Sequence, residues 1–174
     1  EVAEVLSNST IPIVTIESTH PNFPSVECNG RAAARDATRH LINLGHSRIG
    51  LISGMREEPL NFPAPKARTE GYREALEEYG LVPDEAIEIA GNFSLAGGAE
   101  AMTKLMSVFD PPTAVFCLSD EMAIGALKTI RDMGLGVPQD ISIIGFDDHE
   151  IAAYVDLTTI KQPVEGYGER AANL

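Results

Sequence analysis

The sequence predicts an α/β fold with three layers, in which a parallel β-sheet lies between two layers of helices. Short β-branched and apolar runs alternate with longer segments of helical period almost from one end of the chain to the other. Parallel strands that are covered by helices on both faces are typical of this pattern. The 174 residues, of which 44% are hydrophobic, are enough to build one compact core.

Seven runs predict strands, because each is short and rich in β-branched or apolar residues. In chain order they span residues 11–16, 25–28, 48–53, 86–90, 113–118, 141–146 and 158–161. Four longer segments predict helices, because their apolar residues recur at spacings of three and four. Asn29 can cap the first helix, and Gly45, Gly80 and Gly134 stand where three of the helices should end. The predicted helices span residues 30–44, 66–79, 95–109 and 121–133.

Residues 54–65 break this alternation, since they hold three prolines and show no helical period. A loop of this length inside an α/β unit is usually functional. Residues 24–160 supply one complete lobe, whereas residues 1–23 and 161–174 look like parts of a neighbouring lobe. Prolines follow the first strand and the last, at Pro24 and Pro163, so both crossings predict a hinge between two lobes.

The charge balance excludes nucleic-acid and anionic-membrane binding by this segment itself. Thirteen Lys and Arg residues stand against 26 Asp and Glu residues, which gives a net charge of −13. No apolar stretch approaches the length of a membrane span. The two cysteines, Cys28 and Cys117, cannot form a disulfide framework, and Cys117 lies in an apolar run where a buried reduced thiol is expected. A reducing compartment is therefore favoured.

Signals for catalysis and for cofactors are weak. No glycine-rich phosphate loop follows a strand, and no nucleophile elbow is present. The four histidines and two cysteines show no metal-ligand spacing. Asp120 and Asp147 could form an acid/base pair on a glycosidic bond, but nothing in their spacing favours this over ligand binding. We therefore predict no catalytic residue, no metal and no cofactor.

Ligands of open parallel sheets bind outside the carboxyl ends of the strands. The residues that directly follow strands here are mostly anionic or hydrogen-bonding, and Arg68 can reach the same edge. Such a set suits a polyhydroxylated ligand, because carboxylates accept from vicinal hydroxyls and a guanidinium donates to ring oxygens. For Ser119 and Asp120, helix capping and ligand binding stay equally open. The strand-end residues are Glu17, Ser18, Asn29, Ser53, Gly54, Ser119, Asp120, Asp147 and Asp148.

Four long runs resemble the effector-binding core of LacI/GalR-type transcriptional regulators. They are HLINLGHSRIGLISG (40–54), RTEGYREALEEYGL (68–81), TAVFCLSDEMAIGALKTIRDMGLGVPQDISIIGFDD (113–148) and LTTIKQPVEGYGERA (157–171). The resemblance covers nearly the whole chain. It implies a Rossmann-like lobe of the type I periplasmic-binding-protein fold: residues 1–23 end the first effector-binding lobe, residues 24–160 form the complete second lobe, and residues 161–174 return to the first.

The resemblance also implies a biological context. Members of this family bind operator DNA through an N-terminal helix-turn-helix headpiece, which is absent from this chain, and they act as cytoplasmic homodimers or tetramers. Subunit contacts fall on the helix from Met122 to Asp132 and near Tyr154. The alternative that the apolar half of this helix belongs to the core stays open.

The family's ligand positions fall on particular residues of this chain. They correspond to Glu17, where Asp is common, to Arg68, to Ser119, where Asn is common, to the following Asp120, and to Asp147. Three carboxylates against the single cation Arg68 favour a neutral sugar over a phosphosugar or nucleotide. The aromatic rings that could stack on a purine near the cleft are those of Phe62 and Phe93.

Two other functions stay open. A periplasmic sugar-binding protein of a transport system would have the same lobes and the same cleft. An enzyme that acts on sugars is a third and more distant reading, since the chain shows no catalytic constellation of its own.

Overall fold

The computed structural model describes residues 11–18, 22–27, 29–54 and 63–174, and its centre is a five-stranded parallel sheet. The strand order is β4-β3-β5-β6-β7, and every neighbouring pair is parallel. The strands are β3 (Ile49–Ser53), β4 (Glu88–Ala90), β5 (Ala114–Cys117), β6 (Ser142–Asp147) and β7 (Thr158–Lys161). The parallel sheet confirms the fold class expected from the alternating pattern.

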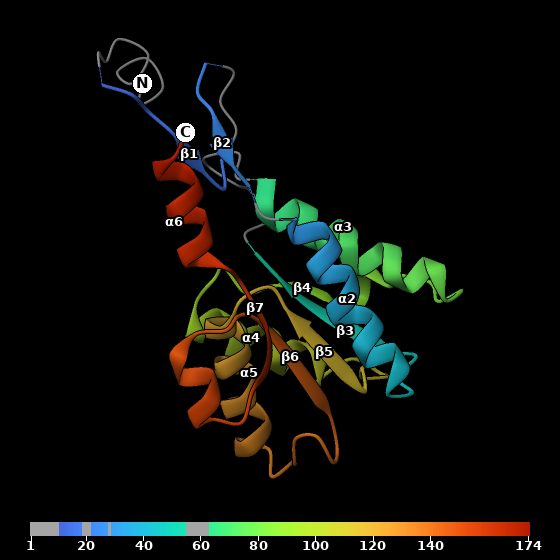
Figure 1. Cartoon of the computed structure of the whole chain (residues 1–174). Helices are drawn as coiled ribbons and strands as arrows, with labels where there is room; N and C mark the ends of the chain where they lie inside the picture. Colours follow the sequence, from blue (N-terminus) through green and yellow to red (C-terminus); the bar gives the residue numbers. More distant parts are fainter. Residues whose placement is uncertain (1–10, 19–21, 28, 55–62) are drawn as a thin grey trace.

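Helices cover both faces of this sheet (Figure 1). Helices α2 (Gly30–Asn43) and α3 (Pro63–Glu78) lie on one face, and α4 (Leu95–Leu105) and α5 (Asp120–Asp132) lie on the other. The chain passes from β3 to β4 through α3, and then returns across the opposite face through α4 and α5 to add β5 and β6. Two short 3-10 helices, η1 (Glu85–Ile87) and η2 (Glu150–Tyr154), complete the connections.

The helix ends follow the signals in the sequence. The side chain of Asn29 accepts a hydrogen bond from the backbone N–H of Ala32 at 3.0 Å, and Gly45, Gly80 and Gly134 have positive φ angles just beyond helix ends. Some predicted bounds were wrong. Helix α3 begins at Pro63, so the end of the predicted loop is helical, and residues 55–62 of that loop lie outside the described residues.

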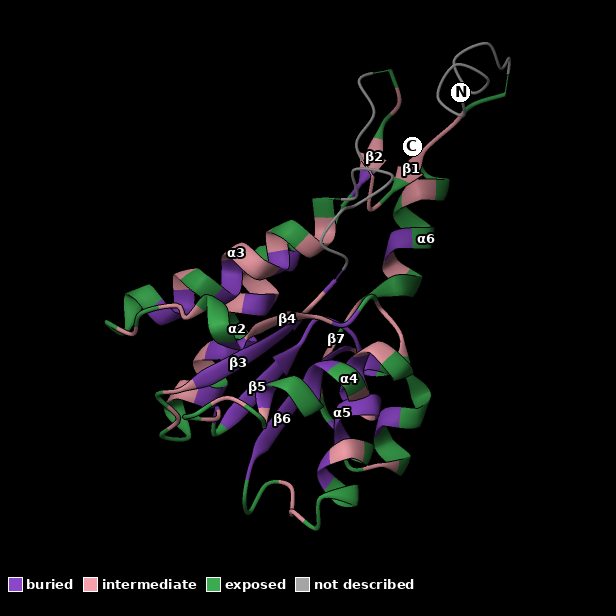
Figure 2. Ribbon diagram, turned by 180° about the vertical axis from the view of Figure 1, so that it is seen from behind, coloured by how far each residue is buried: buried purple, intermediate pink, exposed green. Residues whose placement is uncertain are grey.

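The core lies between the sheet and its two helical layers. Every residue of β5 is buried, and β6 is buried up to Phe146, as Figure 2 shows for the centre of the sheet. Cys117 belongs to this core as a free thiol, and burial raises its pKa, which keeps it protonated. The expectation of a buried reduced thiol is confirmed for Cys117, while Cys28 lies outside the described residues.

Glycines bring the backbones of paired helices into contact. A Cβ on Gly71 of α3 would lie 2.1 Å from the backbone oxygen of Arg31 in α2. On the other face, a Cβ on Gly125 of α5 would lie 2.0 Å from the backbone oxygen of Leu95 in α4. Any other residue at Gly71 or Gly125 would push the helices apart, so these glycines set the helix spacing in each layer.

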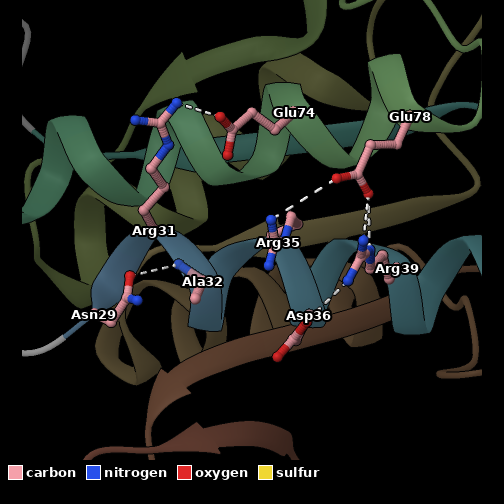
Figure 3. A network of polar contacts seen from close by, with 8 residues as sticks. All are labelled: Asn29, Arg31, Ala32, Arg35, Asp36, Arg39, Glu74 and Glu78. Carbon is pink, nitrogen blue, oxygen red and sulfur yellow. Dashed lines mark hydrogen bonds and ion pairs between the residues drawn. The ribbon is translucent and has the colours of Figure 1, made fainter.

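Ion pairs join α2 to α3 on the outer side of their contact, as Figure 3 shows. Arg31 pairs with Glu74, and the Arg35 and Arg39 guanidinium nitrogens lie 3.8 and 2.6 Å from carboxylate oxygens of Glu78. The three arginines are spaced four residues apart, which places them along one face of α2. Their side chains are a third to a half exposed, so each pair contributes little to stability by itself.

A second, two-stranded sheet stands apart from the first. Strands β1 (Thr15–Ile16) and β2 (Ser25–Val26) pair in parallel, and helix α6 (Val164–Ala172) packs against both. In Figure 1 this small unit lies beyond the end of the main sheet at which β7 finishes. The chain crosses between the two units twice, between β2 and α2 and between β7 and α6. The run at 25–28 was expected in the larger sheet; instead its first two residues pair with β1. The lobe boundaries at residues 24 and 160 stay predictions.

Candidate functional site

The candidate site lies at the carboxyl ends of the five parallel strands. The strand order reverses between β3 and β5, because β4 is added on one side of β3 and all later strands are added on the other. Connections leave in opposite directions at such a point, so backbone groups and helix starts face a common crevice. Arg68 of α3 reaches this edge, where it contacts Leu118 and lies near Asp147.

Arg68 is buried and is held by two residues of β6 and by the residue that follows β5. It is 7% exposed, and its guanidinium carbon lies 3.9 Å from the centre of the Phe146 ring in β6. Its Nη1 donates to the backbone oxygen of Leu118 at 2.9 Å and lies 3.9 Å from the Oδ1 atom of Asp147. The flat face of the guanidinium is therefore fixed by the ring, and its edge faces the ends of β5 and β6.

Asp147 ends β6 in an unusual backbone conformation. Its φ angle is +129°, and Asp148 follows with a φ of +58°. The side-chain amide of Gln162 donates to Oδ1 of Asp147. Burial raises the pKa of Asp147, while the hydrogen bond from Gln162 and the charge of Arg68 act in the opposite direction. The structure thus brings Arg68 and Asp147, two of the five predicted site residues, into one cluster.

Ser119 and Asp120 begin helix α5. The Ser119 hydroxyl accepts from the backbone N–H of Met122 at 3.3 Å, which confirms the capping alternative for this residue. Asp120 is 0% exposed, and burial raises its pKa. Its two carboxylate oxygens accept from the Thr159 hydroxyl at 2.6 Å and from the backbone N–H of His149 at 2.7 Å. Ligand contact by Ser119 and Asp120 stays a prediction.

Glu17 approaches the site from the small sheet. It follows β1 with a φ of +55° and lines a hollow of about 60 Å³ together with Gly30 and the first turns of α3. Gly30 also lies against Arg68, because a Cβ at this glycine would be 3.4 Å from Cγ of Arg68. Glu17 and Arg68 therefore both lie near Gly30, the first residue of α2.

A larger hollow of about 410 Å³ opens between the end of β6 and helix α6. Its walls include Asp147 and Asp148, and the segment from Lys161 to Gly166. The Lys161 ammonium lies 3.3 Å from Oδ2 of Asp148. The expectation that Arg68 would be the single cation at this edge was therefore wrong. Lys161 was not predicted because it is the last residue of its strand, not a residue beyond it.

Two further residues of this cluster were not predicted. Gln162 directly follows the last strand, so the strand-end rule applied to β7 would have found it. Phe146 reads as an ordinary core residue, and only the structure shows that its ring carries the Arg68 guanidinium. Phe93 packs against Gly54 at the end of β3, where a Cβ on the glycine would lie 2.4 Å from the ring. Phe62 lies outside the described residues.

Across residues 11–18, 22–27, 29–54 and 63–174, no group of three or more His, Cys, Asp or Glu side chains could hold a metal ion. Within those ranges, none of the helices is both long and apolar enough to cross a membrane.

The comparisons with known proteins agree on one family. The model described as "Periplasmic binding protein-like domain" matches residues 38–174. Catabolite control protein A of Priestia megaterium is 38% identical over 179 residues, which cover 100% of this chain and 53% of the relative. HTH-type transcriptional repressor CytR of Escherichia coli K12 is 43% identical over 151 residues, which cover 86% of this chain and 43% of the relative. The chain thus spans about half the length of these curated relatives.

Solved structures of known regulators share this fold. A sugar-binding transcriptional regulator of the LacI family from Escherichia coli, solved in complex with phosphate, superposes with a TM-score of 0.85 and is 30% identical. The match covers 97% of this chain and 60% of that structure. CytR is described as a transcriptional repressor, and the Escherichia coli structure is described as a transcriptional regulator.

Proposed function

Because the chain belongs to the periplasmic-binding-protein-like domain family, as the effector-binding core of LacI/GalR-type transcriptional regulators, we propose that it binds a small-molecule effector that controls operator binding. The observation that supports this most is the buried Arg68 guanidinium, which is fixed on Phe146 beside the Asp147 carboxylate at the strand ends. Such a fixed donor and acceptor pair is suited to hold a ligand in one orientation.

The proposed site uses residues from both units of the chain. Arg68 and Asp147 contribute a donor and an acceptor from the main sheet, and Glu17 contributes a carboxylate from the small sheet. Ser119 at the start of α5 completes the proposed set, whereas the neighbouring Asp120 carboxylate is enclosed by the Thr159 hydroxyl and the His149 N–H and acts through them. A ligand that contacts both units favours the arrangement in which they are closest, so binding shifts the equilibrium between two arrangements of the lobes.

We propose that the effector is a neutral sugar. The nearest cations at the site already have anionic partners, since Arg68 lies near Asp147 and Lys161 pairs with Asp148. An added phosphate would therefore meet repulsion from these carboxylates. Neutral hydroxyls can donate to Asp147 and accept from Arg68 without adding charge. The description of the Escherichia coli structure as sugar-binding supports this class, although that protein was solved with phosphate.

A thermal-shift panel on the full-length protein tests the effector class. The panel contains pentoses, hexoses, disaccharides, their phosphates, inorganic phosphate and purines. We expect at least one neutral sugar to raise the melting temperature. Stabilisation by a phosphosugar or a purine, with no response to any neutral sugar, would contradict the proposal.

The assignment of Arg68 is tested by Arg68→Ala, with Arg73→Ala as the control on the same helix. Arg73 is exposed and pairs with Glu88 away from the cluster. Loss of a charged, buried hydrogen bond corresponds to an affinity loss of about tenfold or more. We expect Arg68→Ala, but not Arg73→Ala, to lose this affinity for the sugar that stabilises the wild-type protein. Both variants should retain operator binding. Equal affinities in the two variants would remove Arg68 from the site.

Operator binding is proposed to reside in an N-terminal headpiece outside this chain. The net charge of −13 supports this division, because an acidic surface repels a polyanion. We expect no specific mobility shift of duplex DNA by residues 1–174 alone. Salt-sensitive, sequence-specific binding by these residues would overturn the division. Since operator DNA lies in the cytoplasm, the proposal includes a cytoplasmic location.

Homodimerisation is proposed through helix α5 and η2. The apolar half of α5 lies in the core, so the residues available for a partner are those on its exposed side and Tyr154, which is 79% exposed. Tyr154→Glu places a charge in the proposed contact and should lower the dimer fraction in sedimentation velocity. An unchanged dimer in this variant would exclude Tyr154 from the contact.

A solute-binding protein of a transport system is the second candidate. CytR is described as a repressor and the Escherichia coli structure as a regulator, which favours the regulator. Their descriptions also favour a binding protein over an enzyme. Specific operator binding by the full-length protein would decide for the regulator.

A further inference from the structure

We propose that Asp120 is a positioning residue, which holds the turn at residues 147–149 so that the Asp147 carboxylate faces Arg68 and an effector. This inference rests on the proposed function, since it names how one of the proposed ligand residues is kept in place. It assigns to Asp120 an action through its neighbours, whereas the sequence suggested direct contact with the ligand.

The first support is the complete enclosure of the carboxylate. Asp120 is 0% exposed, although it is the first residue of a helix and its neighbour Glu121 is exposed. One of its oxygens accepts from the Thr159 hydroxyl and the other accepts from the backbone N–H of His149. A buried carboxylate is tolerated only when its oxygens have donors, so these bonds fix its position strongly.

The second support is the backbone of the turn that Asp120 holds. Asp147 and Asp148 both have positive φ angles, a region that is unfavourable for residues other than glycine. Such a conformation persists only where surrounding contacts hold it. The N–H of Asp148 donates to the Thr159 hydroxyl oxygen at 3.3 Å, and that hydroxyl donates to Asp120. Asp120 therefore holds Asp148 through Thr159 and holds His149 directly.

The third support is a glycine that makes room for the carboxylate. A Cβ on Gly145 of β6 would lie 2.3 Å from Oδ1 of Asp120. Gly145 is also paired in register with Thr159 across the β6–β7 ladder. The Asp120 carboxylate at the start of α5 is thus contacted by both neighbouring strands, β6 at Gly145 and β7 at Thr159. Two residues beyond Gly145, the strand ends at Asp147, whose Oδ1 lies 3.9 Å from Nη1 of Arg68.

Thr159→Val gives the cleanest test, because it removes the hydroxyl and keeps a β-branched side chain suited to a strand. Asp120→Ala removes the carboxylate itself. Thr159→Ser keeps the hydroxyl and serves as the rescue, and Thr158→Val serves as the matched control at the exposed neighbouring position of β7. All four variants are made in the full-length protein, and the measurements use the protein without ligand.

Amide hydrogen exchange and the NMR signals of the Gln162 side-chain amide are the two readouts. We expect Thr159→Val and Asp120→Ala to accelerate exchange at Asp148 and His149 by about tenfold or more, as a lost hydrogen bond allows local opening. The Gln162 amide, which donates to Asp147, should shift toward its free-peptide position. Thr159→Ser and Thr158→Val should keep the wild-type values.

A merely structural role predicts a different pattern, in which faster exchange spreads evenly to the amides of β5 and the Gln162 signal stays in place. That pattern, or unchanged exchange at Asp148 and His149 in both loss variants, would overturn the proposal. If Asp120→Ala does not fold, Thr159→Val decides alone. This test is independent of the identity of the effector, because it uses the protein without ligand. If no neutral sugar stabilises the protein, the neutral-sugar proposal is refuted, but the exchange rates at Asp148 and His149 still test the role of Asp120.

Discussion

Replacement of Arg68 by methionine isolates what its guanidinium contributes, because methionine keeps a long apolar side chain against Phe146. The variant loses the hydrogen bond to the Leu118 oxygen, the contact with the ring and the charge near Asp147. A charged hydrogen bond contributes about 1.5–3 kcal/mol. A cation over a desolvated ring contributes about 2 kcal/mol.

The burial of the guanidinium opposes these gains. Arg68 is 7% exposed, and transfer of a cation from water to the protein interior costs several kcal/mol when it is incompletely paired. The net loss expected for Arg68→Met is therefore about 1–3 kcal/mol in the free energy of unfolding at pH 7. The charge of Arg68 also lowers the pKa of Asp147, so this carboxylate is left uncompensated in the variant. Protonation of Asp147 removes that cost, and the loss should shrink as the pH falls.

Urea denaturation at two pH values measures both effects, with Arg73→Met as the control. Arg73 pairs with Glu88, but its side chain is 45% exposed, so we expect its replacement to cost less than about 1 kcal/mol at either pH. Arg68→Met should cost more than Arg73→Met at pH 7, and the difference should narrow toward pH 4. Equal losses in the two variants, or a gain in stability for Arg68→Met, would refute the reasoning.

Three further outcomes follow from packing, salt and protonation. Gly125→Ala should destabilise the fold by about 1–3 kcal/mol in thermal unfolding, because its Cβ would meet the Leu95 backbone, and an unchanged melting temperature would contradict the close approach. Arg39→Gln should lower stability by less than about 1 kcal/mol, and about 0.5 M salt, roughly three times the physiological ionic strength, should abolish the difference, because the pair with Glu78 is partly exposed. The pKa of Asp147 is raised in the folded state, so the folded protein binds this proton more tightly than the unfolded chain does. The stability of wild type relative to Asp147→Asn should therefore increase as the pH falls through that pKa. A decrease in this relative stability over the same pH range would contradict the expectation.

The sequence predicted the central strands well because their signal is local. The runs that became β5 and β6 are apolar on consecutive residues, and their bounds were correct to within one residue. The partner of a strand is not a local property, so the pairing of Ser25–Val26 with β1 was not foreseen. The end of α4 at Leu105 was also missed, since the apolar period continues to Phe109, which the structure leaves fully exposed.

The site could be predicted only in outline. The strand-end rule placed Asp147 at the right edge, because it needs only the strand ends and the parallel sheet. The contact of Arg68 with Phe146 joins residues 78 positions apart (146 − 68), and no spacing in the sequence encodes it. The enclosure of Asp120 depends on Gly145 and Thr159, which belong to two other elements and have no chemical signature of their own.

The glycine contact between α2 and α3 has a mechanical consequence. Gly71 places the backbone of α3 directly on the backbone of α2, so no flexible side chain can absorb a displacement between them. One turn earlier in α3, Arg68 faces the strand ends, while α2 starts just after the crossing from the small sheet. Helices α2 and α3 should therefore behave as one rigid unit. We therefore expect a displacement of Arg68 to move the start of α2 with it, because the two helices meet backbone to backbone.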